Sequence, residues 1–448
     1  MTQQALVIAD ACPQFSSFTA MEYLQIDVAG TFGLDKESWT TRIEWTLNHK
    51  AHFEDIEEMG GDHSLVQSAD EPAQFYASVC AYNKALKGEP TGHMISLDAT
   101  ASGLQILSAL TGCHESAELC NLVNTGERVD AYTSLYEVMK EVNEGELTIE
   151  EEGMFLDFQE QLSNISSIHK KKTIQRADFK QAIMTSLYGS TRMPKKIFGK
   201  GPMLDIFYNV MRTCLPGAWN CNEVLKSLWQ PYALSHDWVM PDNFHVHVKV
   251  MSGTQHMIQI GDTPVAVNLT ENLGTEEGRS LSPNVTHSID GMVVREMGRR
   301  CDYDMDHIYK VSGIILNDHK TAGESTDRKK DKMLLNLWNH YKESGFLSAR
   351  VLDYIDIKNA GLVEYSPILD LLASLPTKPF KVISVHDCFR ALANYGNDLR
   401  KQYNIIMSGI ARSEMLGYLA TQITGTSIPV VKMGCIADDI LNADYSLS

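Results

Sequence analysis

The clearest amphipathic pattern in the chain runs from Ile174 to Ser190. Apolar residues recur there at intervals of three and four, which predicts a helix that ends at Gly189. The recurring apolar residues are Ile174, Ala177, Phe179, Ala182, Ile183 and Leu187. At about 100° per residue, Arg176, Lys180 and Tyr188 fall within one arc of the helix surface. Two cations and a phenol therefore share a face of the predicted helix.

Two apolar runs far apart in the sequence predict strands that carry aspartates. Residues 94–97 predict a buried strand that ends at Asp98, and small residues and a helix follow it. Residues 380–389 predict a strand, a turn that contains Asp387, and a second strand. An aspartate at a strand end can hold a metal ion, but Asp98 can equally cap the following helix. If the fold brings Asp98 and Asp387 together, they form the carboxylate pair that two-metal phosphoryl transfer requires.

The remaining segments are mainly helical, with one β-rich region. Residues 1–90 are expected to be helical after a short strand at 5–9, and the apolar segment 202–232 is expected to face the core. Alternating apolar and polar residues over 238–268 predict a β-hairpin. The segment 282–295 is interpreted as a turn that leads into a helix.

Three polar features fall outside these elements or on their surface. Strand alternation places His245 and His247 on one exposed face, which favours solvated histidines over a metal site. The acid-rich residues 141–152 indicate an exposed connection, and the polar residues 317–332 indicate a surface insertion.

Charge is unevenly distributed along the chain. The 448 residues are enough for two or three domains, and their formal net charge is −18. Residues 170–200 nevertheless contain nine Lys or Arg against one acid, Asp178. Such a run is usually a solvated face, but the ordered face on the predicted helix favours a bound polyanion such as a triphosphate. The acidic total argues against a nonspecific coat on nucleic acid and permits a basic channel.

Composition also excludes some classes of protein. No apolar run is long enough to span a membrane, and the first residues lack the pattern of a signal peptide. The nine cysteines include no CxxC pair and no Cys/His spacing typical of a metal site. Reduced thiols in a cytoplasm are the simplest interpretation.

Three of these segments resemble the catalytic motifs of the single-subunit RNA polymerases of bacteriophages and mitochondria. Residues 98–105, DATASGLQ, resemble the family motif DGSxSGxQ. The spacing Arg176-x3-Lys180-x7-Tyr188-Gly189 resembles the second motif, and residues 385–388, VHDC, resemble the third, HDS. Weaker similarity covers Gly33 to Lys36, the entry to a promoter-reading hairpin at 238–244, a palm helix at 283–290, and a C-terminal tail at 434–448.

The resemblance implies a helix-rich α+β fold, the right-hand polymerase fold of palm and fingers. Residues 1–125 would form the first part of the palm and 126–286 the fingers. Residues 287–448 would form the second part of the palm, with an insertion near 302–378 and the C-terminal tail. The thumb and the N-terminal promoter-binding domain of the family are expected to be absent from this chain.

The resemblance also implies a role for each motif residue. Asp98 and Asp387 would hold two Mg²⁺ ions with the help of the Ala99 carbonyl. The cations Arg176, Lys180 and Lys36 would neutralise the triphosphate. The remaining substrate contacts would come from His386 at the primer end, from Tyr188 with His287 at the ribose 2′-hydroxyl, and from Gly189.

The motifs depart from the family pattern at several positions. Ile106 stands where the family usually has histidine, Cys388 where it has serine, and Gln181 where a further cation is common. Ninety-five residues separate Asp290 from His386, several times the usual spacing, which indicates the insertion.

Two other functions are alternatives to RNA synthesis. A related DNA polymerase would place a bulky glutamate at the position of Gly103 and phenylalanine at that of Met184, so both residues favour ribonucleotides. A non-catalytic nucleic-acid-binding scaffold with the polymerase fold would not need both aspartates, both cations and Tyr188.

The family's DxxGR motif, whose arginine binds the RNA–DNA hybrid, does not occur in this sequence. The resemblance therefore suggests the larger, catalytic subunit of a split phage polymerase, at work in the cytoplasm of an infected bacterium. A smaller subunit would carry DxxGR, and a DNA-binding promoter-recruitment protein would help to start transcription. The other expected partners are template DNA, the RNA transcript and ribonucleoside triphosphates, with no membrane.

Overall fold

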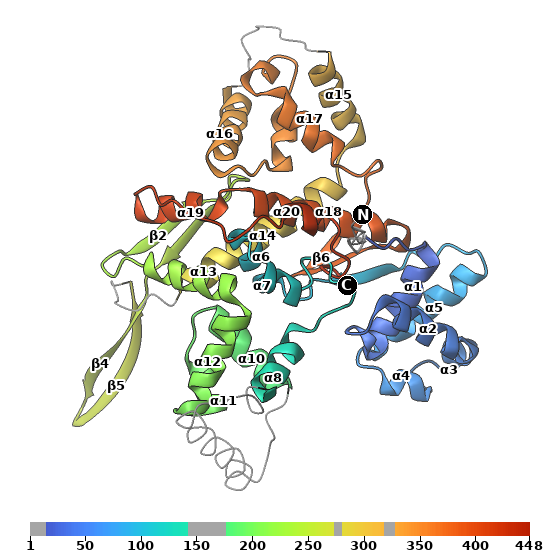
Figure 1. The fold of residues 1–448 in the computed structure, drawn as a ribbon, viewed down its shortest axis with the longest axis horizontal. Helices are drawn as coiled ribbons and strands as arrows, with labels where there is room; N and C mark the ends of the chain where they lie inside the picture. Colours follow the sequence, from blue (N-terminus) through green and yellow to red (C-terminus); the bar gives the residue numbers. More distant parts are fainter. Residues whose placement is uncertain (1–14, 142–175, 273–279, 318–327) are drawn as a thin grey trace, which may run out of the picture.

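The computed structural model describes residues 15–141, 176–272, 280–317 and 328–448. Helices dominate these residues, and the strands form three small antiparallel sheets (Figure 1). The predicted helix-rich α+β class is thus confirmed. The predicted strand at 5–9 and most of the acidic connection at 141–152 lie outside the described residues.

The first part of the chain is a group of helices, as predicted. Thr19 caps the first helix through the amide of Glu22, whose carboxylate accepts from the Thr19 amide in return. The group comprises α1 (Ala20–Ala29), α2 (Trp39–His49), α3 (Phe53–Met59), α4 (Ser64–Ser68) and α5 (Pro72–Leu86). The α1 helix packs against both α2 and α5. A π-helical turn, Gly30–Leu34, follows α1 and leads into the short loop that carries Lys36.

A three-stranded antiparallel sheet joins the two halves of the chain. Its strand order is β1 (Met94–Asp98), β7 (Cys388–Leu392) and β6 (Ile383–Val385). The register pairs Asp98 with Cys388 and Leu97 with Phe389. Both predicted strand segments are therefore confirmed, and their pairing places the end of β1 beside the turn that contains Asp387.

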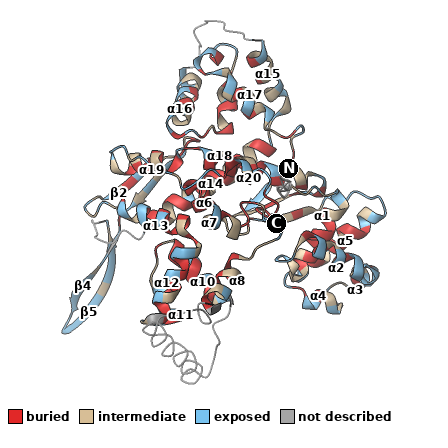
Figure 2. Cartoon of the chain, viewed as in Figure 1, coloured by how far each residue is buried: buried red, intermediate tan, exposed pale blue. Residues whose placement is uncertain are grey.

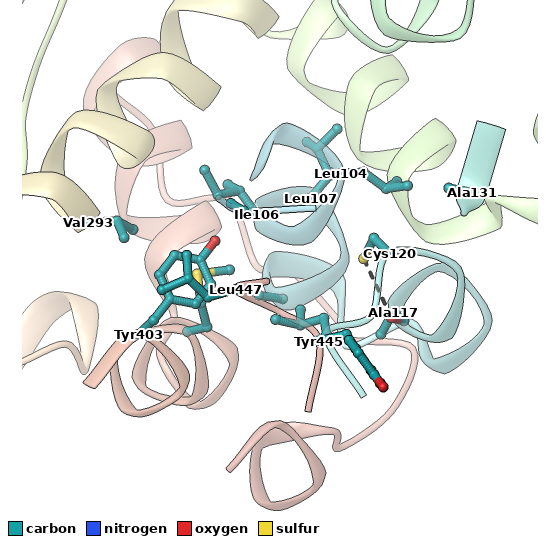
Figure 3. Close-up of a cluster of buried hydrophobic side chains, with 14 of the residues drawn as sticks. Leu104, Ile106, Leu107, Ala117, Cys120, Ala131, Val293, Tyr403, Tyr445 and Leu447 are labelled. Carbon is teal, nitrogen blue, oxygen red and sulfur yellow. Dashed lines mark hydrogen bonds between the residues drawn. The ribbon is translucent and has the colours of Figure 1, made fainter. Parts of the chain in front are cut away.

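Helices behind this sheet form the main apolar core. The three that pack on one another are α6 (Ser102–Thr111), α14 (Leu281–Cys301) and α18 (Gly396–Arg412). Figure 3 shows Ile106 of α6 between the helices that carry Val293 and Tyr403. Ile106 is only 1% exposed, so an isoleucine at the family's histidine position serves the core here. Three further helices are α7 (His114–Leu119), α19 (Met415–Thr424) and α20 (Ala437–Ile440).

A second group of helices surrounds the basic helix. It comprises α8 (Ala131–Glu141), α10 (Arg176–Leu187), α11 (Arg192–Phe198), α12 (Pro202–Cys214) and α13 (Pro216–Ser227). The predicted apolar side of α10 is buried at Phe179, Ala182, Ile183 and Leu187. The ring of Phe179 meets those of Phe198 and Phe207 edge-on, at centroid distances of 5.9 and 5.8 Å. Ala177 lies in the same helix and is exposed.

Two hairpins occupy the β-rich region where one was predicted. The first pairs β2 (Ser235–Val239) with β3 (His245–Lys249), and both histidines at the ends of the HVH run are exposed as predicted. The second pairs β4 (Ser252–Ile260) with β5 (Thr263–Glu271). The single-hairpin prediction is wrong because Gly261, at φ +60°, lets the second apolar run turn back on itself within two residues.

Residues between α14 and β6 form a separate helical cluster with its own apolar core. Its helices are α15 (Met305–Leu316), α16 (Arg328–Ser344) and α17 (Tyr365–Ala373), and the core includes Val311, Trp338 and Ile368. Figure 1 shows the cluster standing apart from the sheet. Residues 328–332 begin α16, so that part of the predicted polar loop is wrong, and 318–327 lie outside the described residues. Among the described helices, none is long and apolar enough to cross a membrane.

Candidate active site

A cavity of about 590 Å³ lies where the end of β1, the β6–β7 turn, α10 and the loop before α2 meet. Six of the predicted site residues line it: Lys36, Asp98, Ala99, Lys180, Tyr188 and Asp387. These residues come from four distant parts of the sequence. The fold therefore assembles most of the predicted site in one place.

The two predicted metal-binding aspartates are brought together by the strand register. The backbone N–H of Ala99 donates to the carbonyl oxygen of Asp387 at 3.2 Å, so the two segments touch at this point. On the other side, the backbone of Asp98 exchanges hydrogen bonds of 3.1 and 2.9 Å with that of Ser448. Burial and, after it, the negative charge of Asp387 raise the pKa of Asp98 to about 6. The Asp387 carboxylate thus makes Asp98 harder to ionise.

This carboxylate pair suits a hard divalent cation. Carboxylate and carbonyl oxygens are the ligands that Mg²⁺ prefers, and a cation would relieve the repulsion that raises the Asp98 pKa. Across the described ranges, no three or more His, Cys, Asp or Glu side chains converge in a metal-binding group. Protein groups alone would therefore leave open positions for water and substrate oxygens.

The alternative role of Asp98 as a helix cap is wrong. The α6 helix begins at Ser102, and the residue at its N-cap position is Ala101. Asp98 lies upstream of that position, and its carboxylate faces the cavity instead.

A third carboxylate, Asp290 of α14, was not assigned a role from the sequence. Burial, followed by the charge of Asp387, raises its pKa to about 6, while the nearby His386 acts in the opposite direction. His386 occupies the β6–β7 turn with a positive φ of 56°. The predicted primer-end residue therefore lies beside the carboxylates, although it does not line the cavity. The only sequence signal for Asp290 was its place in the similarity at 283–290.

Lys180 of α10 lies near the carboxylates. Lys180 is exposed, and its charge acts to lower the pKa of Asp98. Its Nζ lies 5.2 Å from the centroid of the Tyr132 ring, a contact that the sequence did not indicate. Arg176 is the first residue of α10, but its side chain is outside what the structure describes.

Tyr188 is fixed between a glycine and a histidine. A Cβ on Gly103 would lie 2.4 Å from the Tyr188 hydroxyl oxygen, so only glycine accommodates the phenol in this position. The Tyr188 ring stacks on that of His287 at a centroid distance of 5.2 Å, although His287 does not line the cavity itself. Burial raises the pKa of Tyr188, which keeps its hydroxyl protonated and able to donate. Gly189 ends the helix at φ +77°, as predicted.

The Lys36 loop is held by two guanidinium groups. Arg42 donates from Nε to the Glu37 carbonyl at 3.1 Å and from Nη2 to the Asp35 carbonyl. Arg128 donates to the Lys36 carbonyl at 2.8 Å. Burial lowers the pKa of Arg42 to about 9, so the group stays charged at neutral pH. Three successive carbonyls are thereby fixed, and the Lys36 side chain is left half-exposed at the cavity.

Gln105 connects the first motif to the rest of the core. Its amide donates to the carbonyl of Ser446 at 2.9 Å and to that of Cys120 at 3.0 Å. Its own carbonyl accepts from the hydroxyl of Tyr403 on α18 at 2.6 Å. A buried side chain with all these partners fixes the start of α6 and, with it, the backbone that follows Asp98.

Comparisons with known proteins find similarity to RNA polymerases. Residues 17–199 match the family of DNA-dependent RNA polymerase, a match that covers less than half of the chain. A "probable DNA-directed RNA polymerase" of Neurospora crassa is 30% identical over 179 residues, which are 38% of this chain and 18% of that protein. A protein with the same description from Gelasinospora sp. (strain G114) is 23% identical over 394 residues, which are 82% of this chain and 41% of that protein.

The chain spans less than half the length of these relatives. The family match includes Lys36, Asp98, Lys180 and Tyr188 and implies the right-hand polymerase fold for the segment. Asp387 lies beyond the match. The assignment of Asp387 as a metal ligand therefore depends on the β1–β7 register, which places this residue beside Asp98.

The contact between Gly103 and Tyr188 can be tested by stability. Gly103→Ala should lower the free energy of unfolding by about 1–3 kcal/mol, because the new methyl group overlaps the phenol. In a Tyr188→Phe background the cost should shrink, since the oxygen it meets is gone. Equilibrium urea denaturation measures both, with Gly298→Ala, which meets nothing within 4 Å, as the control. An equal cost in both backgrounds would contradict the contact.

The raised pKa of Asp98 predicts how Mg²⁺ binding depends on pH. Below a pKa of about 6 this carboxyl is protonated, so protons compete with the cation and affinity should fall as pH is lowered through 6. Titration calorimetry with Mg²⁺ from about pH 5 to 8 measures the effect. Asp98→Asn should bind weakly at every pH without this inflection, whereas Asp290→Asn should keep it. If the wild-type protein bound Mg²⁺ with the same affinity from about pH 5 to 8, the prediction would be contradicted.

Proposed function

We propose that this chain carries the catalytic site of a DNA-dependent RNA polymerase, which adds ribonucleotides to an RNA 3′ end. The observation that carries the proposal is the cavity that joins Asp98, Asp387, Lys180 and Lys36. A pair of carboxylates opposite two cations is the arrangement that nucleotidyl transfer needs: acidic ligands at the reacting phosphorus and positive charge along the triphosphate.

Each side chain has a role that follows from its position. Asp98, Asp387 and the Ala99 carbonyl would hold two Mg²⁺ ions, which when bound would promote ionisation of the RNA 3′-hydroxyl and offset the charge of the triphosphate. Lys180 and Lys36, with Arg176, would bind the triphosphate oxygens and orient the α-phosphate toward the carboxylates. His386 would position the primer end.

Choice of a ribose is assigned to Tyr188 and His287. The stacked rings hold the phenol against Gly103, at the edge of the cavity. A protonated hydroxyl in this place can donate to or accept from the 2′-hydroxyl of a ribonucleotide. Gly103 thus leaves room for the Tyr188 hydroxyl in this position. It also lacks the bulky side chain with which a DNA polymerase would block the 2′-hydroxyl.

A smaller second subunit is part of the proposal, and the central sheet supports it. The outer edge of β6 pairs with no other strand of the described chain, and Ile383 and Val385 on β6 are 51% and 53% exposed. An exposed apolar edge strand invites pairing with another chain. Phage origin, action in an infected bacterium and a promoter-recruitment protein remain predictions from the motif resemblance. The relatives named above come from Neurospora and Gelasinospora.

The catalytic proposal is tested by removing either carboxylate. Asp98→Ala or Asp387→Ala should abolish Mg²⁺-dependent extension of an RNA primer on a DNA template, because each removes a metal ligand. The assay uses the chain purified together with the proteins that bind it. Asp62→Ala, at an exposed position of the first helical group outside the cavity, should extend normally. More than a few per cent of residual activity in either cavity variant would overturn the two-metal assignment.

Sugar selection gives an independent test. Tyr188→Phe should admit deoxynucleotides with little loss of ribonucleotide use, because a site that hydrogen-bonds a hydroxyl rejects the analogue that lacks it. The measurement is the ratio of kcat/KM for a ribonucleotide to that for its deoxy counterpart. The same ratio in the variant as in the wild type would remove Tyr188 from this role.

A further inference from the structure

The β4–β5 hairpin is a two-stranded ribbon that stands away from the body of the molecule. Its strands pair along their whole length, from Ser252 with Glu271 to Ile260 with Thr263. No other described element packs extensively on either strand, and neither apolar core includes a residue of the ribbon. Figures 1 and 2 show it projecting beside α13, largely in the colour of exposed residues.

The two faces of the ribbon differ in chemistry. Residues paired across antiparallel strands point to the same side, and successive residues alternate. The register places Ile258, Ile260, Val265, Val267 and Leu269 on one side, here called the apolar face, together with Thr254, His256 and Thr263. The opposite side, here called the polar face, mixes Gln255, Gln259, Asn268 and Thr270 with Met257, Pro264 and Ala266.

The apolar face is uncovered. Ile258, Ile260, Val265 and Leu269 are 46%, 63%, 37% and 43% exposed. An isolated two-stranded hairpin is at best marginally stable in water, and a continuous apolar patch of this kind marks a contact surface. Burying it would recover roughly 25 cal/mol per Å² of apolar area. The ribbon is therefore built to lie against something else.

The charged residues of the ribbon indicate which kind of molecule binds its apolar face. Residues 250–272 contain no Lys and no Arg, and their only acids are Asp262 at the tip and Glu271, whose carboxylate lies 3.2 Å from His256 Nε2. Binding to nucleic acid depends on cations that neutralise phosphates, so this ribbon is unsuited to DNA or RNA. A second copy would bring the same two acids and a formal net charge of −18 against itself. The complementary surface is apolar at its centre with lysine or arginine at its edge.

We propose that the apolar face of β4–β5 is the docking site of a different protein, which presents an apolar patch rimmed by basic side chains. The ribbon follows residues 238–244, which the motif resemblance identified as the entry to a promoter-reading hairpin, but the composition of the ribbon suits contact with protein and not with DNA. The proposal holds whether or not the catalytic assignment is correct, because no residue of the ribbon lines the cavity.

Photo-crosslinking from the two faces gives the first test. p-Benzoylphenylalanine is placed at Ile258 on the apolar face, or at the adjacent Gln259 on the polar face, of the full chain in the cells where it acts. The expected result is one discrete protein adduct from position 258 and none from 259. Adducts with DNA or RNA, with a second copy, or within the chain itself overturn the proposal, as does the absence of any adduct from 258.

Affinity measured with the purified adduct protein gives the second test. Ile258→Thr and Val265→Thr keep a β-forming side chain but remove apolar surface, and each should weaken binding at least tenfold. Gln255→Thr and Gln259→Thr on the polar face should bind as the wild type does. Circular dichroism checks that all four variants fold. Equal losses on both faces, or none on the apolar face, would refute a docking surface of this shape.

Discussion

The account depends on the antiparallel pairing of β1 with β7. Leu97 and Phe389 face each other in this ladder and are each 1% exposed, so the pairing is locked into the core. A slip of one residue would turn every side chain of β1 to the opposite face and carry Asp98 away from the cavity. The same register holds Asp98 beside Asp387 against their mutual repulsion, which shows in the raised pKa of Asp98. Core packing thus stabilises an arrangement that electrostatics alone opposes.

Positive charges on one side of Asp98 and Asp387 offset part of the repulsion between these two carboxylates. Lys180 on α10 and the clamped Lys36 loop bring positive charge to a chain that is strongly acidic overall. Neither lysine is buried, so both remain free to bind an anion in the cavity. Asp290 adds a further negative charge behind Asp387. The site is therefore polarised, with acids at the strand ends and cations toward the helix and the loop.

The pattern of apolar and polar residues predicted most of the helices and strands, because each of these elements is set by residues that are close in the sequence. The periodicity of α10, the strand before Asp98 and the turn at Asp387 all follow from such signals and all are confirmed. The meeting of Asp98 and Asp387 could not be derived from the residues alone, since it depends on pairing between distant strands. It was implied only by the motif resemblance. The contact of Gly103 with Tyr188 and the clamp on the Lys36 loop were missed for the same reason. The Gly261 turn, by contrast, was a local signal that was overlooked.

The most direct test of the central claim is to locate the metal on the chain. Fe²⁺ that replaces Mg²⁺ generates hydroxyl radicals with ascorbate and peroxide, and these cut the backbone within reach of the ion. The account predicts cuts near both Asp98 and Asp387, suppressed together by excess Mg²⁺ and lost together in Asp387→Ala. Cuts at only one of these segments, or at neither, would contradict a shared metal site at the β1–β7 junction.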